Sequence, residues 1–521
     1  MLLTLCTALL LGPVPHQLPR PRLVVLIAID QMRGDYLDRY RSQWTGAFKD
    51  ILEHGAFFPN ARQDHAVTET APGFSTLLSG RTPAHTGIVN NTYGVSDSSA
   101  PLLGTAGPGA SPWRFLGSSL ADWLLSEDST ARLLSISRKD RSAILPLGRA
   151  RGKAYWFSGG RFTTSRYYEQ SLPAWVTAYN DRRGAERLAG KFWNLLRPVA
   201  EYAETDSMPY EHGGRDLTFP HRVPADSLAA ALQMPDFPWI DSLTLDMALE
   251  GVRAMQLGTD QATDLLAVSL SATDAIGHAY GPDSRELHDQ LLRLDHWIGW
   301  FLDSLALVIP PEEVVFVLSG DHGVQSFPEF TRDVRHQDAG RVSLKGLTTQ
   351  LGAELEARYH SSFDIQNESG LLTANVVAMR ARGINIDSLA ESYAAEVRRL
   401  RGVTRVLTPV LLEAAAPGDS IARLWRRQIP QAQGWIAAAA LAPRFIWADT
   451  GGWTTHGSLD AQDMSVPVVF WGAGVKPGRN RQTVSTVDIA PTLAALIGIH
   501  PAELLDGQVL GQALARQPAK Q

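Results

Sequence analysis

Four segments of the chain are almost entirely apolar, where a half-exposed strand would alternate apolar with polar residues. Continuous apolar runs of this length are typical of strands that are buried on both faces in the middle of a parallel sheet. The segments are residues 23–29, 265–270, 314–318 and 466–471.

Apolar residues recur at helical spacing in the regions between these runs. Residues 486–497 have this amphipathic pattern near the C-terminus. The alternation of buried strands with amphipathic helices predicts an α/β fold with a mostly parallel central sheet and helices on both faces. The clearest helical series follows Pro282 and consists of Leu287, Leu291, Leu294, Ile298, Phe301 and Leu305.

Two long stretches, residues 91–238 and 326–444, do not follow this alternation. We interpret both as insertions that form a cap over the core. In the second insertion, residues 374–379 have a strand-like pattern, and Ser388 followed by Glu391 is typical of a helix start. The remaining catalytic core would be discontinuous and comprise residues 20–90, 239–325 and 445–515.

The N-terminus begins with a short apolar run over residues 2–11. This run is too short to span a bilayer but has the length of the hydrophobic region of a secretory signal, so residues 1–18 are predicted to be a signal peptide. A plain N-terminal tail is the alternative. Because no later run is long enough for a membrane helix, the sequence predicts a periplasmic or secreted protein without a membrane span.

The composition excludes several classes of protein and of site. A net charge of -6 disfavours a protein dedicated to binding nucleic acid, although a local basic site is compatible with it. The single cysteine, Cys6, lies in the predicted leader. Disulfides, thiolate metal sites and a cysteine nucleophile are therefore excluded from the folded body, and a metal ion would need His, Asp, Glu or hydroxyl ligands.

Polar residues that suit metal binding follow the apolar runs. Ligands of open α/β sheets lie beyond the carboxyl ends of the strands, where three of the runs are followed by an aspartate. Taken singly, each residue has an ordinary explanation, such as a helix cap or a surface histidine. Together, carboxylates and imidazoles favour a divalent metal centre. The set is Asp30, Thr70, Asp274, His278, Asp321, His322 and His456.

Thr70 begins the segment Thr70-Ala71-Pro72-Gly73, which precedes a helix-like stretch at residues 74–78. A hydroxyl at such a turn lies near the free N–H groups of the helix, which favour an incoming phosphoryl group. Threonine is also a common helix cap, so the turn alone is weak evidence.

These motifs together resemble the alkaline phosphatase superfamily. Within it, residues 137–146, with the run Lys139-Asp140-Arg141, are similar to a segment of the phosphate-irrepressible alkaline phosphatases, which are monoesterases with a threonine nucleophile. The resemblance rests on Ile29-Asp30, Thr70-Ala71-Pro72-Gly73, Gly87-Ile88-Val89-Asn90-Asn91, Asp274-x-x-x-His278, Asp321-His322-Gly323 and Thr455-His456-Gly457.

The resemblance implies a role for each of these residues. Thr70 would be the nucleophile and would form a phosphothreonine intermediate. Two Zn²⁺ ions would be bound, and Asn91, Lys139 and Arg141 would hold the phosphoryl oxygens. The implied ligands are Asp274, His278 and His456 for one ion, and Asp30, Asp321 and His322 with the Thr70 hydroxyl for the other.

The resemblance also implies an alkaline phosphatase that hydrolyses small-molecule phosphate monoesters. A monoester is a dianion, so Lys139 and Arg141 would favour it over a diester, which carries one charge. A solvated basic face is the alternative explanation for these two residues. The alternative functions are a phosphodiesterase or nucleotide pyrophosphatase on the same core and a non-catalytic, metal-dependent anion-binding protein.

The chain departs from the superfamily pattern after the nucleophile. Ala71 and Phe74 stand where Gly and His are common, which changes local geometry beside Thr70. The aromatic stretch at residues 155–168 has two explanations, a pocket for the leaving group and packing in the protein core.

Overall fold

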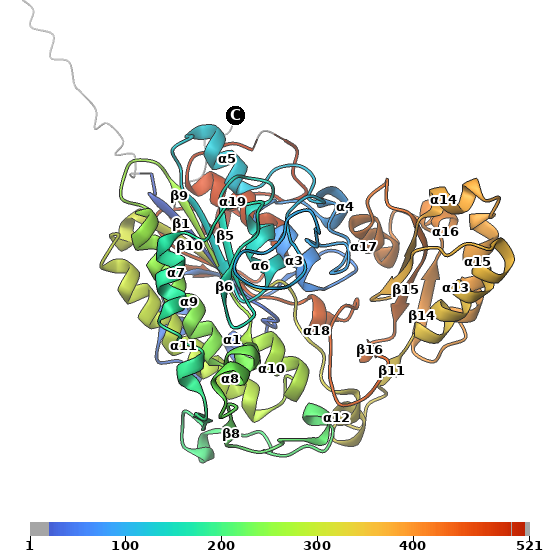
Figure 1. Ribbon diagram of the computed structural model, residues 1–521, viewed down its shortest axis with the longest axis horizontal. Helices are drawn as coiled ribbons and strands as arrows, with labels where there is room; N and C mark the ends of the chain where they lie inside the picture. The colour runs from blue at the N-terminus through green and yellow to red at the C-terminus, as the bar shows by residue number, and fades with distance from the viewer. Residues whose placement is uncertain (1–19, 502, 516–521) are drawn as a thin grey trace, which may run out of the picture.

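A nine-stranded sheet forms the centre of the molecule (Figure 1). The computed structural model describes residues 20–501 and 503–515, so the predicted signal peptide at residues 1–18 lies outside the described residues. The order of the strands is β18-β2-β17-β10-β1-β9-β4-β5-β6. Their bounds are β1 Leu23–Ile29, β2 Ala56–Phe58, β4 Leu133–Ser137, β5 Lys153–Ser158, β6 Arg161–Thr163, β9 Asp264–Leu270, β10 Val314–Ser319, β17 Val468–Gly472 and β18 Gly478–Arg479.

The central strand β1 explains why its sequence is apolar at every position. It pairs in parallel with β9 on one side and β10 on the other, and all seven of its residues are buried. Alternate residues point to opposite faces of a strand. Val25 and Ile27 accordingly join one hydrophobic cluster, whereas Val24 and Leu26 join another. The predicted α/β fold with a mostly parallel sheet is confirmed.

Helices cover both faces of this sheet, as Figure 1 shows. The predicted helix after Pro282 is α11, and the pattern at residues 486–497 contains α19. One face packs against α2 (Ala47–His54), α7 (Ala174–Asp181), α9 (Trp239–Met255) and α11 (Arg285–Ala306). The other packs against α3 (Thr70–Leu77), α5 (Leu120–Glu127), α6 (Asp140–Ile144) and α19 (Ile489–Leu496). None of the helices in the described residues is long and apolar enough to cross a membrane.

The region 91–238 requires a correction, because part of it belongs to the central sheet. Strand β4 pairs in parallel with both β9 and β5, and β6 continues the sheet beyond β5. The sequence of β4 includes Ser135 and Ser137 and therefore lacks a continuous apolar run, yet all five of its residues are buried. The expectation that this whole region forms a cap was therefore wrong.

The region 326–444 forms most of a smaller unit with its own four-stranded sheet, β12-β13-β15-β14, which we call the cap. Figure 1 shows it beside the main sheet in yellow to orange. A hydrophobic cluster that includes Val67 and Val89 from the core and Trp425 from the cap joins the two units. The strands associated with the cap are β11 Gly340–Val342, β12 Ile365–Glu368, β13 Leu371–Ala374, β14 Val403–Leu407, β15 Trp435–Leu441 and β16 Phe445–Trp447. Its helices are α13 Lys345–Tyr359, α14 Val376–Ala381, α15 Ile386–Val397, α16 Pro409–Ala414 and α17 Ser420–Gln428.

Two local predictions in the cap had different outcomes. The strand predicted over residues 374–379 is wrong, because β13 ends at Ala374 and the side chain of Asn375 caps the helix α14. The helix predicted near Ser388 is present as α15. Its cap is Asn385, whose side chain accepts a hydrogen bond from the backbone N–H of Ser388.

Candidate metal centre and active site

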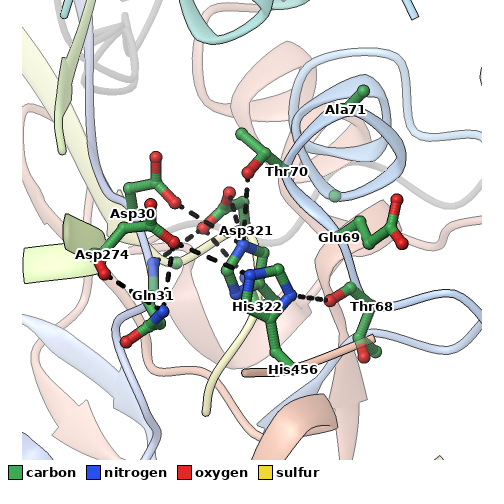
Figure 2. A network of polar contacts seen from close by, with 12 residues as sticks. Asp30, Gln31, Thr68, Glu69, Thr70, Ala71, Asp274, Asp321, His322 and His456 are labelled. Atoms are coloured by element: carbon green, nitrogen blue, oxygen red, sulfur yellow. Dashed lines mark hydrogen bonds and ion pairs between the residues drawn. The ribbon is translucent and has the colours of Figure 1, made fainter. Parts of the chain in front are cut away.

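The carboxyl ends of three neighbouring parallel strands bring acidic side chains together. Asp30 directly follows β1, and Asp321 follows β10 after one glycine. Asp274 lies in the first turn of α10 (Ala272–Tyr280), the helix that follows β9. Because β1 lies between β9 and β10, the three carboxylates meet at one edge of the sheet, as Figure 2 shows.

Asp30, Asp321 and His322 form the first compact group, with one potential ligand atom of each within 4.8 Å of the others. The Nε2 atom of His322 lies 3.5 Å from Oδ1 of Asp30 and 3.3 Å from Oδ2 of Asp321. The hydroxyl oxygen of Thr70 lies 3.4 Å from the same Nε2. The structure thus brings together all four residues that were expected at one metal ion.

Asp274 is the centre of the second group. Its Oδ1 lies 3.2 Å from Nε2 of His278 and 3.7 Å from Nε2 of His456. His322 lies between the two groups, because its ring stacks on that of His456 with centroids 3.6 Å apart, and it forms a compact set with Asp274 and His456. The three residues expected at the other ion are therefore also close together.

Backbone carbonyl groups orient all three histidines in the same way. Each ring has its Nδ1 within hydrogen-bond distance of a carbonyl oxygen, which fixes the Nδ1–H tautomer and leaves the Nε2 lone pair toward the carboxylates. Metal-binding histidines are commonly held in this manner. The contacts are His278 to Thr454 (2.8 Å), His322 to Gly323 (2.9 Å) and His456 to Thr68 (2.7 Å).

Burial sets the protonation preferences of these groups. Burial, together with the nearby carboxylate of Asp30, raises the pKa of Asp321 well above its usual range. Burial also lowers the pKa of His322 to about 4 and that of His456 well below its usual value. Oδ1 of Asp30 and Oδ2 of Asp321 are buried and accept no hydrogen bond from the residues that the structure describes. Neutral imidazoles beside unpartnered carboxylate oxygens are donors that fit a divalent cation.

Lys139 reaches into the space between the two groups. Its ammonium nitrogen lies 2.6 Å from Oδ2 of Asp30, 2.6 Å from Oδ2 of Asp274 and 3.4 Å from the hydroxyl oxygen of Thr70. Burial opposes ionisation of Asp274, but Lys139 and His278 hold the pKa of this carboxyl well below its usual range. Lys139 is thus a buried member of the site rather than part of a solvated basic face.

Arg141 lies in α6, two residues beyond Lys139, and is more peripheral. Its side chain is 28% exposed, and its Nη1 is 3.7 Å from Oδ1 of Asp140. Its Nε is buried and has no hydrogen-bond partner in the described part of the chain. Among the described residues, no hydrogen bond or ion pair joins Arg141 to Thr70 or Asn91.

A close approach of α3 to the end of β10 positions Thr70. Thr70 is the first residue of this helix, and a Cβ added at Gly73 would lie only 2.1 Å from the carbonyl oxygen of Asp321. Glycine is therefore required for this packing. The backbone N–H of Ala71 donates to Oδ1 of Asn91 at 2.9 Å, which holds Asn91 beside Thr70.

The departures from the superfamily pattern leave the polar groups of the site in place. Ala71 and Phe74 are fully buried in the hydrophobic cluster beneath α3. The aromatic stretch at residues 155–168 also belongs to the core, because Tyr155, Trp156 and Tyr168 are buried there. This burial favours core packing over a leaving-group pocket as the explanation of the stretch.

Gln31, which was not among the residues predicted from the sequence, connects the two groups. Its backbone N–H donates to Oδ1 of Asp321 at 3.0 Å, and its side-chain amide donates to Oδ1 of Asp274 at 3.1 Å. Gln31 is fully buried and has a positive φ of 64°, which is uncommon for a residue other than glycine. Its position directly after Asp30 was the only signal in the sequence.

The contribution of the cap is likewise not apparent from the sequence. The hydroxyl of Ser369 donates to Oε1 of Glu69, the residue before Thr70. Oε2 of Glu69 accepts from the backbone N–H of Asn91 at 3.0 Å. Burial, followed by the nearby carboxylate of Glu368, raises the pKa of Glu69 well above its usual range. These contacts link the cap to the residue beside the candidate nucleophile.

Comparisons with known proteins found a matching family model and several similar proteins. Residues 24–459 match the family model of type I phosphodiesterase / nucleotide pyrophosphatase. The chain is 31% identical to the alkaline phosphatase PhoV of Synechococcus elongatus, over 96% of this chain and 94% of that protein. It is 29% identical to the alkaline phosphatase PafA of Elizabethkingia meningoseptica, over 96% of each chain. The crystal structure of wild-type PafA superposes with a TM-score of 0.87 at 27% identity, covering 96% of this chain and 100% of PafA.

Proposed function

The chain belongs to the type I phosphodiesterase / nucleotide pyrophosphatase family and is a phosphatase enzyme, and we propose that it hydrolyses phosphate monoesters through a phosphothreonine intermediate at a two-zinc site. One observation carries this proposal. The hydroxyl oxygen of Thr70 lies 3.4 Å from Nε2 of His322 and 3.4 Å from the ammonium of Lys139, at the N-terminus of a helix. A nucleophile placed there meets a phosphoryl group among groups that favour negative charge.

The residues around Thr70 fit a pair of Zn²⁺ ions. When bound, two Zn²⁺ ions would lower the pKa of the Thr70 hydroxyl and offset the negative charge of the phosphoryl group. Carboxylate and imidazole donors also serve other divalent metals, so the metal content is part of what must be measured. The proposed ligands are Asp30, Asp321, His322 and Thr70 for one ion, and Asp274, His278 and His456 for the other.

The reaction has two steps. Oγ of Thr70 attacks phosphorus, the bond between phosphorus and the ester oxygen breaks, and the departing oxygen takes up a proton while Thr70 loses one. A water molecule then attacks phosphorus, which releases inorganic phosphate and restores the threonine hydroxyl. Asn91, held beside Thr70 through the N–H of Ala71, orients the phosphoryl group in both steps.

Lys139 and Arg141 support a monoester as the substrate. A monoester carries two charges and three non-bridging oxygens, so additional cations stabilise it more than they stabilise a diester. Lys139 is already beside Thr70. Arg141 has a buried, unpartnered Nε that an anionic oxygen would satisfy.

Phosphodiesterase or nucleotide pyrophosphatase activity is the second candidate, favoured by the description of the matching family. A phosphodiesterase would use the same nucleophile and metal ligands. The two candidate activities therefore differ mainly in whether the site binds the third non-bridging oxygen of a monoester or the second ester substituent of a diester. We also propose a periplasmic or secreted location, which the apolar run at residues 2–11 supports.

The phosphothreonine intermediate can be tested directly. Zinc-loaded enzyme is mixed with 4-nitrophenyl phosphate, quenched in acid during turnover and digested, and the peptides are analysed by mass spectrometry. The phosphate should be found on Thr70. Thr70→Ala should lose both the modified peptide and at least about 10³-fold in kcat/KM. Thr70→Ser, which keeps a hydroxyl, should retain the modification, whereas turnover without modification in either protein would contradict the mechanism.

A further inference from the structure

We propose that the cap forms a pocket for the leaving group and that this pocket selects uncharged, hydroxyl-rich leaving groups of the sugar class over leaving groups that carry an additional negative charge. The inference rests on the proposed function, because the pocket opens beside the residues proposed to hold the phosphoryl group. It adds what the proposed function leaves open, namely which part of the molecule contacts the rest of the substrate.

The pocket is a cavity of about 520 Å³ between the core and the cap. Small-molecule pockets commonly have volumes of about 300–1,000 Å³, so a monosaccharide fits this space. Asn91, His278 and His456 form part of its core wall. Residues from β11, the start of α13, β12 with its following turn, and the end of β16 form the cap wall. When a substrate's phosphoryl group is bound at Thr70, its leaving group would therefore lie beside the cap.

A tight turn fixes the cap wall to the core. Ser369 and Gly370 connect β12 to β13, and both have positive φ values, 49° and 80°. A left-handed conformation is unfavourable for serine and persists where surrounding contacts hold it. Here the hydroxyl of Ser369 donates to Glu69, and Glu368 accepts from the backbone N–H of Thr92 at 3.0 Å. Figure 2 shows the Glu69 side chain pointing away from Asp30 and Asp321.

The charges that line the cavity determine its selectivity. The carboxyl groups of Glu368 and Asp449 face one ammonium group, that of Lys345, and the carboxyl of Glu69 is not counted as a charge because its pKa is raised well above its usual range. This excess of acidic groups repels an additional carboxylate or phosphate on the leaving group. Anions are therefore disfavoured in the pocket even though the phosphoryl site beside it favours them.

The uncharged part of the lining suits hydroxyl groups. The cap contributes the amides of Gln366 and Asn367 and the hydroxyl of Thr349, which can donate and accept hydrogen bonds. The hydroxyl of Thr348 already donates to the carbonyl oxygen of Leu344. Trp447, at the end of β16, adds an aromatic surface against which the apolar face of a sugar ring can pack. Amides, hydroxyls, carboxyls and one indole together match a polyhydroxylated ligand.

Two phosphate esters of similar size test this selectivity. Glucose 6-phosphate has an uncharged leaving group, whereas 6-phosphogluconate has an added carboxylate. We expect kcat/KM for glucose 6-phosphate to exceed that for 6-phosphogluconate by about tenfold in the wild-type enzyme. Glu368→Gln and Asp449→Asn should each decrease this ratio, and Lys345→Met should increase it, because these changes alter one charge in opposite directions.

The outcomes separate this inference from the proposed function. Glu356→Gln removes a charge from the exposed part of α13 outside the cavity and serves as the control, with the wild-type ratio expected. If the enzyme hydrolyses none of glucose 6-phosphate, 6-phosphogluconate and 4-nitrophenyl phosphate, the proposed function is overturned. Efficient hydrolysis of both esters with equal kcat/KM, or a ratio that Glu368→Gln, Asp449→Asn and Lys345→Met leave unchanged, would overturn the pocket alone.

Discussion

The two walls of the cavity are built in different ways. On the core side, the cavity adjoins the buried metal centre, in which Asp30 directly follows β1 and Asp321 follows β10 after one glycine. On the cap side, Lys345 and Asp449 are exposed and Glu368 is partly buried. A buried, mutually dependent set of groups cannot be altered singly without large cost, whereas exposed groups on a separate unit can vary. This difference is consistent with the proposal that the core carries out the chemistry and that the cap selects the leaving group.

The largest effect should come from removing one charge from the buried group of the core, in contrast to the same change on the exposed surface of the cap. Asp321→Asn keeps an oxygen that can accept the hydrogen bonds from the N–H groups of Gln31 and His322 but removes a ligand charge. We expect a loss of at least about 100-fold in kcat/KM together with loss of bound metal, since changes in residues that only orient ligands already cost about 10–100-fold.

The matched control for this variant is Asp387→Asn, the same change at an exposed position of α15 in the cap. Steady-state kinetics and elemental analysis of the dialysed proteins provide the two readouts. Full metal content in Asp321→Asn would contradict the assignment of Asp321 as a ligand.

A smaller effect is expected from Gln31, which positions the carboxylates of the core without being a proposed ligand. Asparagine tolerates a positive φ, but its shorter side chain should not reach Asp274. Gln31→Asn should therefore weaken metal binding by about 10–100-fold while preserving the backbone. Competition with a chelator measures this affinity without relying on activity. An affinity equal to that of the wild type would show that the contact with Asp274 has no positioning role.

The smallest effect should arise where the cap touches the core. Ser369→Gly removes the hydroxyl that donates to Glu69 and is compatible with the positive φ at this position. Loss of one such hydrogen bond costs about 1 kcal/mol, so kcat/KM should fall a few-fold with unchanged metal content. Kinetics with glucose 6-phosphate and metal analysis check both parts. A loss as large as that of Asp321→Asn would remove the distinction between the two walls.

The sequence predicted the core better than the cap for a physical reason. Strands that are buried on both faces need apolar residues at every position, so β1 could be predicted from its sequence. Asp30, the residue directly after β1, could then be predicted to lie at the end of the strand. Asp274 and His278 are four residues apart, which places them on one side of α10. Thr70 and His456 could be named as candidates from their residue types, but only the motif resemblance indicated how they divide between the two expected ions.

Other features depend on contacts between distant segments and could not be predicted. Strand β4 contains serines, so its sequence does not indicate a buried strand. It is buried because it lies between β9 and β5 in the sheet. The role of Ser369 depends on a turn in the cap that lies 300 positions from Glu69 in the chain. The cavity itself is formed by segments separated in sequence, so no local pattern reveals its lining.

We propose a phosphomonoesterase site in which Lys139 and Arg141 recognise the additional charge of a monoester. The most direct test compares kcat/KM for phenyl phosphate and diphenyl phosphate in the zinc-loaded wild type and in the double variant Lys139→Ala, Arg141→Ala. We predict that the wild type prefers the monoester and that the double variant loses much more monoester than diester activity. A wild-type preference for the diester, or equal losses on both substrates, would contradict the account.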